Sequence, residues 1–189
     1  MNEYLKLFRS LGLVDAYLEN SSEHWDKRRV WTREFSWAIP TDSALQIIAD
    51  LGPIVEIGAG TGYWAHLLRA MGVDVKAYDL YPPSENGWHP GAAQWTKVVE
   101  GGPERAGFHE DRTLVLCWPP YSSEMAANAL KVYQGTTVVY IGEGNGGCTG
   151  DDEFHELLES HWDIELHQIP QWYGIHDILH VCKRKVRSL

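Results

Sequence analysis

Residues 55–62 read Val-Glu-Ile-Gly-Ala-Gly-Thr-Gly, and this stretch decides the fold of the chain. The residues that lead into it, Ile54–Ile57, form a short and mostly apolar run that is typical of a buried strand. The three glycines let the backbone turn sharply and lie close to a ligand, because no Cβ atom stands in the way. Apolar residues at helical spacing follow from Trp64 to Met71. The order of strand, glycine loop and helix predicts a ligand-binding turn at the edge of an α/β sheet.

An acidic residue, Asp79, follows the glycine loop where a ribose-binding acid is expected. Residues 73–78 predict the second strand, and Asp79 ends it, 17 positions after Gly62. A carboxylate at this place can accept hydrogen bonds from both hydroxyls of a ribose. We therefore expect the glycine loop and Asp79 to bind a nucleoside together.

The spacing of the glycines distinguishes two classes of cofactor. A dinucleotide site has the spacing G-x-G-x-x-G and places a pyrophosphate at the N-terminus of the helix. This chain has G-x-G-x-G, and Glu56 lies two positions before the first glycine. A carboxylate repels a pyrophosphate but favours a cationic ammonium or sulfonium group. The pattern favours S-adenosylmethionine, with a dinucleotide site and a purely structural turn as the alternatives.

On these residues the sequence resembles the Rossmann-like, class I S-adenosylmethionine-dependent methyltransferases. The resemblance covers about residues 40–184, and its specific part is Val55–Leu80. In that family the position of Glu56 orients the glycine loop and helps to hold the methionine ammonium group. The position of Asp79 is that of the ribose-binding acid, and Glu100 is the nearest match to a polar residue beside the adenine. The resemblance implies that S-adenosylmethionine, with S-adenosylhomocysteine as product, is bound by Glu56, Gly58, Ala59, Gly60, Gly62, Asp79, Leu80, Glu100 and Cys117.

The rest of the chain alternates predicted strands and helices, which indicates a mostly parallel sheet covered on both faces. We expect strands at residues 54–57, 73–78, 96–100, 113–117, 137–141, 164–169 and 178–183, the last two as an antiparallel pair. Helices are expected at 3–18, after Thr41 or Asp42, after the glycine loop, after Ser122 or Ser123, and from Asp151. The prediction is a single α/β domain over residues 1–189, a doubly wound seven-stranded sheet (residues 40–189) behind a short helical N-terminal extension (residues 1–39).

The residues that follow two of the predicted strands are expected to lie beside the methyl acceptor. The fourth strand leads into Trp118-Pro119-Pro120-Tyr121, which matches the motif of amino-group methyltransferases (Asp, Asn or Ser, then Pro-Pro and an aromatic residue) except at its first position. The indole of Trp118 has only a donor, so it cannot accept a hydrogen bond from a target amino group. The fifth strand leads into a glycine-rich loop that carries Glu143. We predict that Trp118, Pro119, Pro120, Tyr121 and Glu143 form the catalytic part of the site.

An oxygen or carbon acceptor also needs a general base close to its proton. Besides Glu143 and Tyr121, three histidines on predicted loops are candidates: His89, His109 and His176. No His, Cys or carboxylate group shows metal-ligand spacing, so we expect no catalytic metal.

The tryptophan-rich segment 25–40 precedes the helix that leads into the first strand. Trp31, Phe35 and Trp37 can either close over bound cofactor as a lid or pack as part of the core. Both interpretations are open at the level of the sequence.

The charge and composition of the chain limit the classes of partner that it can bind. The chain of 189 residues carries a formal net charge of −10, which works against sequence-independent binding of nucleic acid. It contains no apolar run long enough to span a membrane and no signal-peptide pattern, and its three scattered cysteines suit the cytoplasm. We therefore expect a methyltransferase for a small-molecule or modest polar acceptor. The alternatives are an adenine-N6-type nucleic-acid methyltransferase and a non-catalytic S-adenosylmethionine-binding or protein-interaction module; the sequence does not indicate an oligomeric state.

Overall fold

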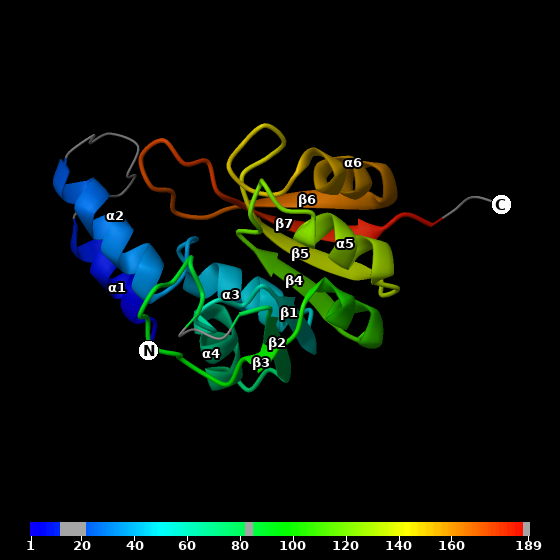
Figure 1. Ribbon diagram of the computed structural model, residues 1–189, viewed down its shortest axis with the longest axis horizontal. Coiled ribbons are helices and arrows are strands. Elements are labelled where there is room, and N and C mark those ends of the chain that lie inside the picture. The colour runs from blue at the N-terminus through cyan, green and yellow to red at the C-terminus, as the bar shows by residue number, and fades with distance from the viewer. Residues whose placement is uncertain (12–21, 82–84, 187–189) are drawn as a thin grey trace.

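The computed structural model describes residues 1–11, 22–81 and 85–186, and its centre is a seven-stranded sheet (Figure 1). The strand order is β3-β2-β1-β4-β5-β7-β6. The strands are β1 (Ile54–Ile57), β2 (Val75–Asp79), β3 (Val99–Glu100), β4 (Thr113–Cys117), β5 (Thr137–Gly142), β6 (Trp162–Gln168) and β7 (Ile178–Arg184). Strands β1 to β5 pair in parallel, whereas β7 is antiparallel to both β5 and β6. The predicted doubly wound, mostly parallel sheet is confirmed.

Helices cover both faces of this sheet (Figure 1). One face is covered by α3 and α4, and the other by α5, α6 and a short 3-10 helix, η2. The helices are α1 (Glu3–Ser10), α2 (Ser22–Glu34), α3 (Asp42–Ala49), α4 (Tyr63–Ala70), η2 (Pro103–Phe108), α5 (Met125–Val132) and α6 (Asp152–His161). Because both faces are covered, a strand such as β1 is buried along its whole length, with Ile54 on one face and Val55 on the other.

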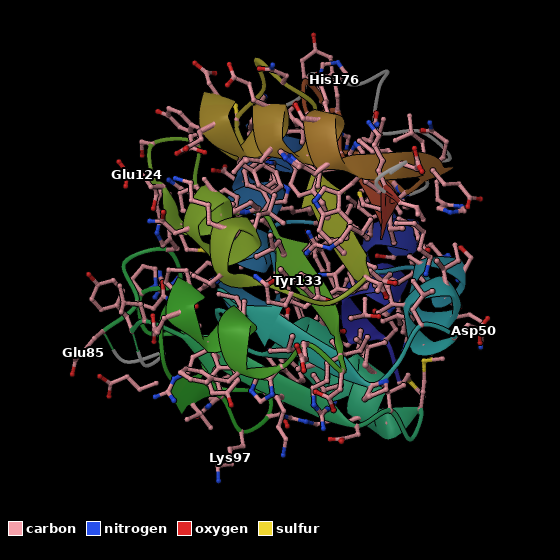
Figure 2. All side chains as sticks on the ribbon, turned by 90° about the vertical axis from the view of Figure 1, so that its right-hand side faces the viewer. Asp50, Glu85, Lys97, Glu124, Tyr133 and His176 are labelled. Atoms are coloured by element: carbon pink, nitrogen blue, oxygen red, sulfur yellow. The ribbon has the colours of Figure 1, made fainter. Side chains whose placement is uncertain are left out.

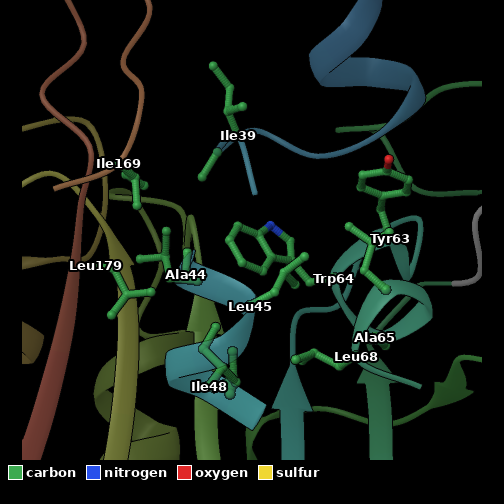
Figure 3. Close-up of a cluster of buried hydrophobic side chains, with 14 of the residues drawn as sticks. Ile39, Ala44, Leu45, Ile48, Tyr63, Trp64, Ala65, Leu68, Ile169 and Leu179 are labelled. Carbon is green, nitrogen blue, oxygen red and sulfur yellow. The ribbon is translucent and has the colours of Figure 1, made fainter. Parts of the chain in front are cut away.

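Apolar side chains fill the space between the layers. Trp64 of α4 lies in the middle of one cluster, between Leu45 of α3 and Ile39 (Figure 3). Charged side chains such as Glu85 and Lys97 point outward, whereas the Tyr133 ring lies inside the molecule (Figure 2). This core fixes the carboxyl ends of β1, β2, β4 and β5 along one edge of the sheet.

Two of the three helix N-caps that the sequence predicts are present in the structure. The Thr41 hydroxyl accepts from the Ala44 backbone N–H, and the Asp151 carboxylate accepts from the Phe154 N–H, as expected of N-caps. The N-cap residue of α5 is Glu124 rather than Ser122 or Ser123, and Glu124 makes no side-chain cap hydrogen bond. The Ser123 hydroxyl nevertheless accepts from the N–H of Met125, the first residue of the helix, at 3.3 Å.

Several predicted boundaries are corrected by contacts distant in sequence. The predicted third strand, 96–100, shortens to β3, because the preceding segment bonds elsewhere: the Trp95 N–H donates to the Thr61 carbonyl, and Arg69 donates to the Thr96 hydroxyl. The second strand begins at Val75 rather than at residue 73, and β6 begins at Trp162 rather than at residue 164. The helix predicted over 3–18 ends at Ser10, and its remainder lies mostly outside the described residues. Helix η2 was not predicted.

The N-terminal extension is part of the core. Tyr4 of α1 is fully buried, and its hydroxyl accepts a hydrogen bond from Trp172 Nε1 at 3.0 Å. Its backbone N–H donates to the Tyr63 hydroxyl of α4 at 3.0 Å. The Asn2 side chain donates to the Pro40 carbonyl at 2.7 Å. Helix α1 thereby joins the connection before β7 to the helix that follows the glycine loop.

Substitution of Tyr4 tests this role of the extension. Tyr4→Phe leaves the buried Trp172 Nε1–H without its acceptor, so we expect the free energy of unfolding to fall by about 1–3 kcal/mol. Tyr121→Phe is the matched control, because the Tyr121 side chain is 61% exposed and its variant should unfold as the wild type does. Urea denaturation of the wild type and the two variants measures the difference. Equal stability of Tyr4→Phe and the control would mean that α1 docks without this hydrogen bond.

Candidate functional site

The glycine loop between β1 and α4 adopts the backbone conformation that its glycines allow. Gly58, Gly60 and Gly62 have φ angles of +74°, +53° and +76°, in the left-handed region that residues with a Cβ atom rarely adopt. The turn reverses the chain at the carboxyl end of β1, the place where open α/β sheets bind ligands. The structure thus places the loop where the sequence predicted it.

The backbone N–H groups of Gly58, Ala59, Gly60 and Gly62 in this loop are bonded within the protein. The Gly58 and Ala59 N–H groups both donate to the Tyr78 carbonyl at 2.9 Å. The Gly60 N–H donates to Asp79 Oδ2 at 2.8 Å, and the Gly62 N–H donates to the Ala59 carbonyl at 2.8 Å. A pyrophosphate needs N–H groups that point freely at it. The loop is therefore poorly suited to a dinucleotide phosphate.

Asp79 ends β2 beside the loop, and Glu100 ends the neighbouring strand β3 in register with it. The Asp79 carboxylate is buried, and its Oδ1 accepts from the Tyr81 N–H at 3.0 Å and from the Asn86 side chain at 3.3 Å. Leu80, the next residue, is 55% exposed. An exposed apolar side chain directly after Asp79 offers a surface on which a base can lie.

Glu56 lies under the loop on the middle of the sheet, almost fully buried. Burial raises the pKa of its carboxyl group to about 8, although the Arg69 charge and the Ala65 backbone N–H act in the opposite direction. Its Oε2 atom is buried and has no hydrogen-bond partner among the described residues. Cys117, at the end of β4, lies near it, and burial raises the pKa of that thiol as well. A buried acidic oxygen without a partner suits a cationic ligand group.

His89 packs against the glycine loop rather than standing free as a base. Its ring is buried, and Nδ1 lies 2.9 Å from the Arg33 carbonyl. A Cβ atom built on Gly60 would lie only 2.7 Å from His89 Nε2. Burial lowers the pKa of His89, so the ring is neutral at neutral pH. His109, another candidate base, bonds the Tyr78 hydroxyl at 3.0 Å beside η2.

Trp118 holds a strained conformation at the end of β4. Its φ of +53° is the only positive value of a non-glycine residue in the described part of the chain, and this region costs an L-residue about 1–2 kcal/mol. Its N–H donates to the Ile141 carbonyl at 2.8 Å, and its indole Nε1 donates to Asp177 Oδ1 at 2.7 Å. Its ring stacks on Trp37, with centroids 5.0 Å apart. Strain of this kind persists where surrounding contacts enforce it, and it is common at functional sites.

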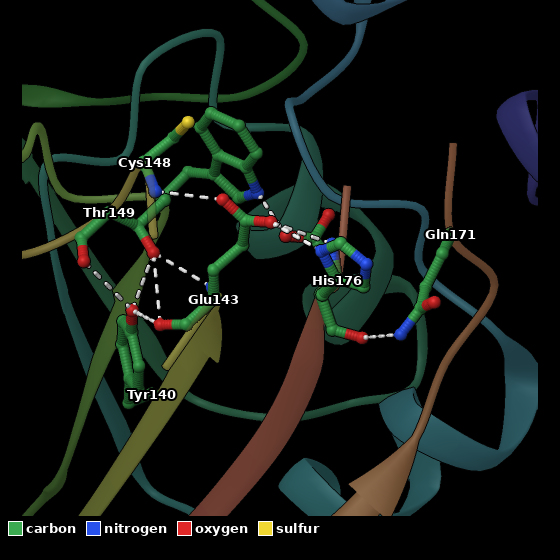
Figure 4. A network of polar contacts seen from close by, with 8 residues as sticks. Tyr140, Glu143, Cys148, Thr149, Gln171 and His176 are labelled. Atoms are coloured by element: carbon green, nitrogen blue, oxygen red, sulfur yellow. Dashed lines mark hydrogen bonds and ion pairs between the residues drawn. The ribbon is translucent and has the colours of Figure 1, made fainter. Parts of the chain in front are cut away.

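Glu143 connects the glycine-rich loop after β5 to the turn before β7 (Figure 4). Its Oε2 accepts from the Cys148 N–H at 2.7 Å, and its Oε1 accepts from the His176 N–H at 2.8 Å. Despite burial, these hydrogen bonds hold the pKa of Glu143 below its ordinary value. Both oxygens are engaged, so Glu143 positions two loops and is not a free base in this conformation.

The two prolines of the predicted catalytic segment are held by the same loop. Pro120 forms a β-bridge with Thr149, and the Pro119 carbonyl accepts from the Gly150 N–H at 2.8 Å. The Tyr121 ring that follows is 61% exposed. The predicted segment therefore lies beside Glu143 at the edge, with its tyrosine open to solvent.

Sequence reasoning missed two residues of this edge, Asp177 and Arg28. Asp177 is 1% exposed, and burial raises its pKa to about 7. Arg28 of α2 lies over the rings of Trp25, Trp37 and Trp118. Neither residue belongs to a local motif. The tryptophan-rich segment 25–40 contains Arg28, but no sequence signal pointed toward Asp177.

The segment 25–40 divides into two parts. Phe35 is buried and stacks on Tyr4 at 5.1 Å, and Trp31 packs against Trp172 at 5.9 Å between centroids, so both belong to the scaffold in this structure. Trp37 instead faces Trp118 at the edge.

The described residues contain neither a cluster of metal ligands nor a helix that could span a membrane. Within 1–11, 22–81 and 85–186, no group of three or more His, Cys, Asp and Glu side chains could hold a metal ion. In the same parts of the chain, no helix combines the length and apolar character that crossing a bilayer requires.

Comparison with known proteins identifies the fold. Magnesium protoporphyrin IX methyltransferase from Synechocystis PCC 6803, with bound S-adenosylmethionine, is 10% identical with a TM-score of 0.54 over 89% of this chain and 88% of that one. The 1,6-didemethyltoxoflavin-N1-methyltransferase from Burkholderia thailandensis, with bound 1,6-didemethyltoxoflavin and S-adenosylhomocysteine, is 20% identical with a TM-score of 0.52 over 97% and 90%. No protein-family model matches the chain, and no curated protein matches it. The chain has the Rossmann-like fold of class I methyltransferases.

The close approach of His89 to the loop can be tested with two glycine substitutions. Gly60→Ala and Gly72→Ala both place a Cβ atom at a positive φ, but a Cβ on Gly72 meets nothing within 4 Å. We expect Gly60→Ala to lose about 1–3 kcal/mol more stability than Gly72→Ala, because only the first clashes with a packed ring. Chemical denaturation of both variants measures the difference. Equal losses would show that His89 moves aside without cost.

The raised pKa of Asp177 predicts how stability depends on pH. An unfolded aspartate titrates near pH 3.9, so between about pH 4 and 7 the native state binds more protons than the unfolded state. The ionisation of Asp177 therefore lowers the free energy of unfolding as pH rises through this window. Asp177→Asn removes this dependence while an amide oxygen can still accept from Trp118 Nε1. Urea denaturation should show the variant gaining stability over wild type between about pH 5 and pH 8; a difference that does not change with pH would contradict the raised pKa.

Proposed function

We propose that this protein is an S-adenosylmethionine-dependent methyltransferase that acts on a small-molecule or modest polar acceptor. The observation that carries the proposal is the set of polar groups at the carboxyl ends of β1 and β2, which we call the glycine-loop edge. Four N–H groups of the loop are bonded internally, a buried Glu56 oxygen lacks a partner among the described residues, and Asp79 ends the next strand. This combination suits a ligand with a ribose and a cationic group and without phosphates. The two methyltransferase structures compared above contain this cofactor or its product, which supports the proposal.

Each part of the cofactor would meet a different strand end. Asp79 would accept from the ribose hydroxyls, replacing the Asn86 side chain, and Glu100 and Leu80 would border the adenine. Glu56, Gly58, Ala59, Gly60, Gly62 and Cys117 would border the methionine end. A bound cation would lower the pKa of Glu56 from its raised value and so convert a buried neutral acid into a carboxylate.

The acceptor would lie against the neighbouring strand ends. When bound, S-adenosylmethionine supplies an activated methyl group on its sulfonium sulfur. The role of the protein's own residues is to orient the acceptor and to exclude water. Trp118 and Trp37 form a stacked wall for this purpose, and Glu143 holds the loops behind that wall. The exposed Tyr121 ring adds a surface for a planar acceptor.

The alternative acceptor is a nucleic-acid base, which the Pro119-Pro120-Tyr121 motif favours. The Trp118 indole argues against a nucleic-acid base, because its one N–H donor is already bonded to Asp177. The net charge of −10 also argues against binding of nucleic acid. The third alternative is a module that binds the cofactor without transfer. A tritiated methyl-transfer assay with nucleic acid, with a small-molecule extract and with no acceptor separates the three. For the compartment we propose the cytoplasm, which suits the free thiols of Cys117, Cys148 and Cys182.

Asp79→Asn tests the cofactor assignment. Hydrogen bonds to a charged group contribute about 1.5–3 kcal/mol each, so the neutral amide should weaken S-adenosylhomocysteine binding about tenfold or more. Isothermal titration calorimetry measures the affinity, and Asp163→Asn, at an exposed position of β6, is the control that should bind as wild type. The wild type should give no heat with NAD. Unchanged affinity in the folded Asp79→Asn variant would refute the ribose assignment.

A further inference from the structure

Arg28 lies among three tryptophan rings, beside the wall of Trp118 and Trp37 that we assign to the acceptor. The Arg28 guanidinium carbon lies 5.5 Å from the ring centroid of Trp37, 5.6 Å from that of Trp25 and 5.9 Å from that of Trp118. These residues come from helix α2, from the segment that follows it and from the end of β4. The rings contact the cation through their faces, at distances at which cation–π attraction is effective. This cage holds the guanidinium beside the wall that we assign to the acceptor.

The Nε–H donor of Arg28 is buried and has no acceptor among the residues that the structure describes. The charges of two carboxylates, Asp177 and Glu143, act on Arg28, but Asp177 Oδ1 accepts from Trp118 and both oxygens of Glu143 accept from backbone N–H groups. A buried N–H donor without a partner is costly. The unpartnered Nε–H of this half-buried arginine indicates a ligand that accepts hydrogen bonds.

We propose that Arg28 binds a carboxylate group of the methyl acceptor, so that the substrate is a planar organic acid. The proposal rests on the proposed function and names the substrate class of that site. The planar guanidinium presents paired N–H donors that match the two oxygens of a carboxylate. The ring of Trp88, which is 52% exposed and lies edge-on to Trp37, is suited to the flat part of such a molecule.

The charges around Arg28 favour a carboxylate over other ions. A phosphate dianion would meet Glu143 and Asp177 close to Arg28, in a chain of net charge −10. A cationic substrate would need Arg28 to leave the cage, because the guanidinium already occupies the space between the indoles. A singly charged anion balances the one guanidinium and leaves the carboxylates in their hydrogen bonds.

Binding of benzoate as a probe tests the assignment. The protein is first titrated with S-adenosylhomocysteine by calorimetry, and the saturated complex is then titrated with benzoate, inorganic phosphate and tetramethylammonium while tryptophan fluorescence is recorded. We expect benzoate to bind best and Arg28→Met to weaken it about tenfold or more. Arg29→Met is the matched control, because the Arg29 side chain is 82% exposed and pairs with Asp26; it should bind benzoate as wild type. Arg28→Lys keeps the charge without the paired donors and should weaken binding by less than Arg28→Met.

The outcomes separate this inference from the proposed function. Wild type, Arg28→Met and Arg28→Lys should bind S-adenosylhomocysteine alike, which also shows that the variants are folded; where Arg28→Met fails this check, Arg28→Lys is compared with Arg29→Met. Normal binding of S-adenosylhomocysteine with benzoate binding that does not depend on Arg28 would overturn the inference and leave the proposed function standing. Tighter binding of phosphate or of tetramethylammonium than of benzoate would overturn it too. Absence of S-adenosylhomocysteine binding by the wild type would refute the proposed function, and with it the assignment of Arg28 to a methyl acceptor.

Discussion

The hydrogen bond from the Gly60 backbone N–H to the Asp79 carboxylate ties the first turn of the sheet to the end of the second strand. Together with the two N–H groups that donate to the Tyr78 carbonyl, it fixes the glycine loop against β2. Only a loop of glycines can follow this path, because three of its residues have positive φ angles. The direction of α4, the position of Asp79 and the packing of His89 all depend on this turn.

The other half of the edge depends on a second local constraint, the left-handed backbone of Trp118. Its strain is balanced by contacts from three segments: Ile141 on β5, Asp177 before β7 and Trp37 after α2. The N-terminal helices therefore help to build the edge as well as to cover the core. Because α2 also brings Arg28 to the same place, the extension contributes to the chemistry that we propose for the acceptor.

The sequence was most informative where local rules decide the structure. The glycine loop, the buried strand before it, Asp79 at the end of β2 and the caps Thr41 and Asp151 could all be predicted from short patterns. The limits of β3 could not, because Trp95 and Thr96 bond to residues about thirty positions away. The hydrogen bond from the His176 N–H to Glu143, across 33 positions, could not be predicted for the same reason. Asp177 and Arg28 become part of the site only through tertiary contacts, which no periodicity or motif reports.

The central claim is that the glycine-loop edge binds S-adenosylmethionine with Asp79 on the ribose and the sulfonium end toward Trp118. A crystal structure of the protein with S-adenosylhomocysteine tests it most directly. We expect both ribose hydroxyls within about 3.2 Å of the Asp79 carboxylate, the methionine end beside Glu56 and Gly58, and the sulfur facing the Trp118 side of the edge. A ligand bound elsewhere on the molecule, or bound at this edge with its ribose away from Asp79, would refute the assignment.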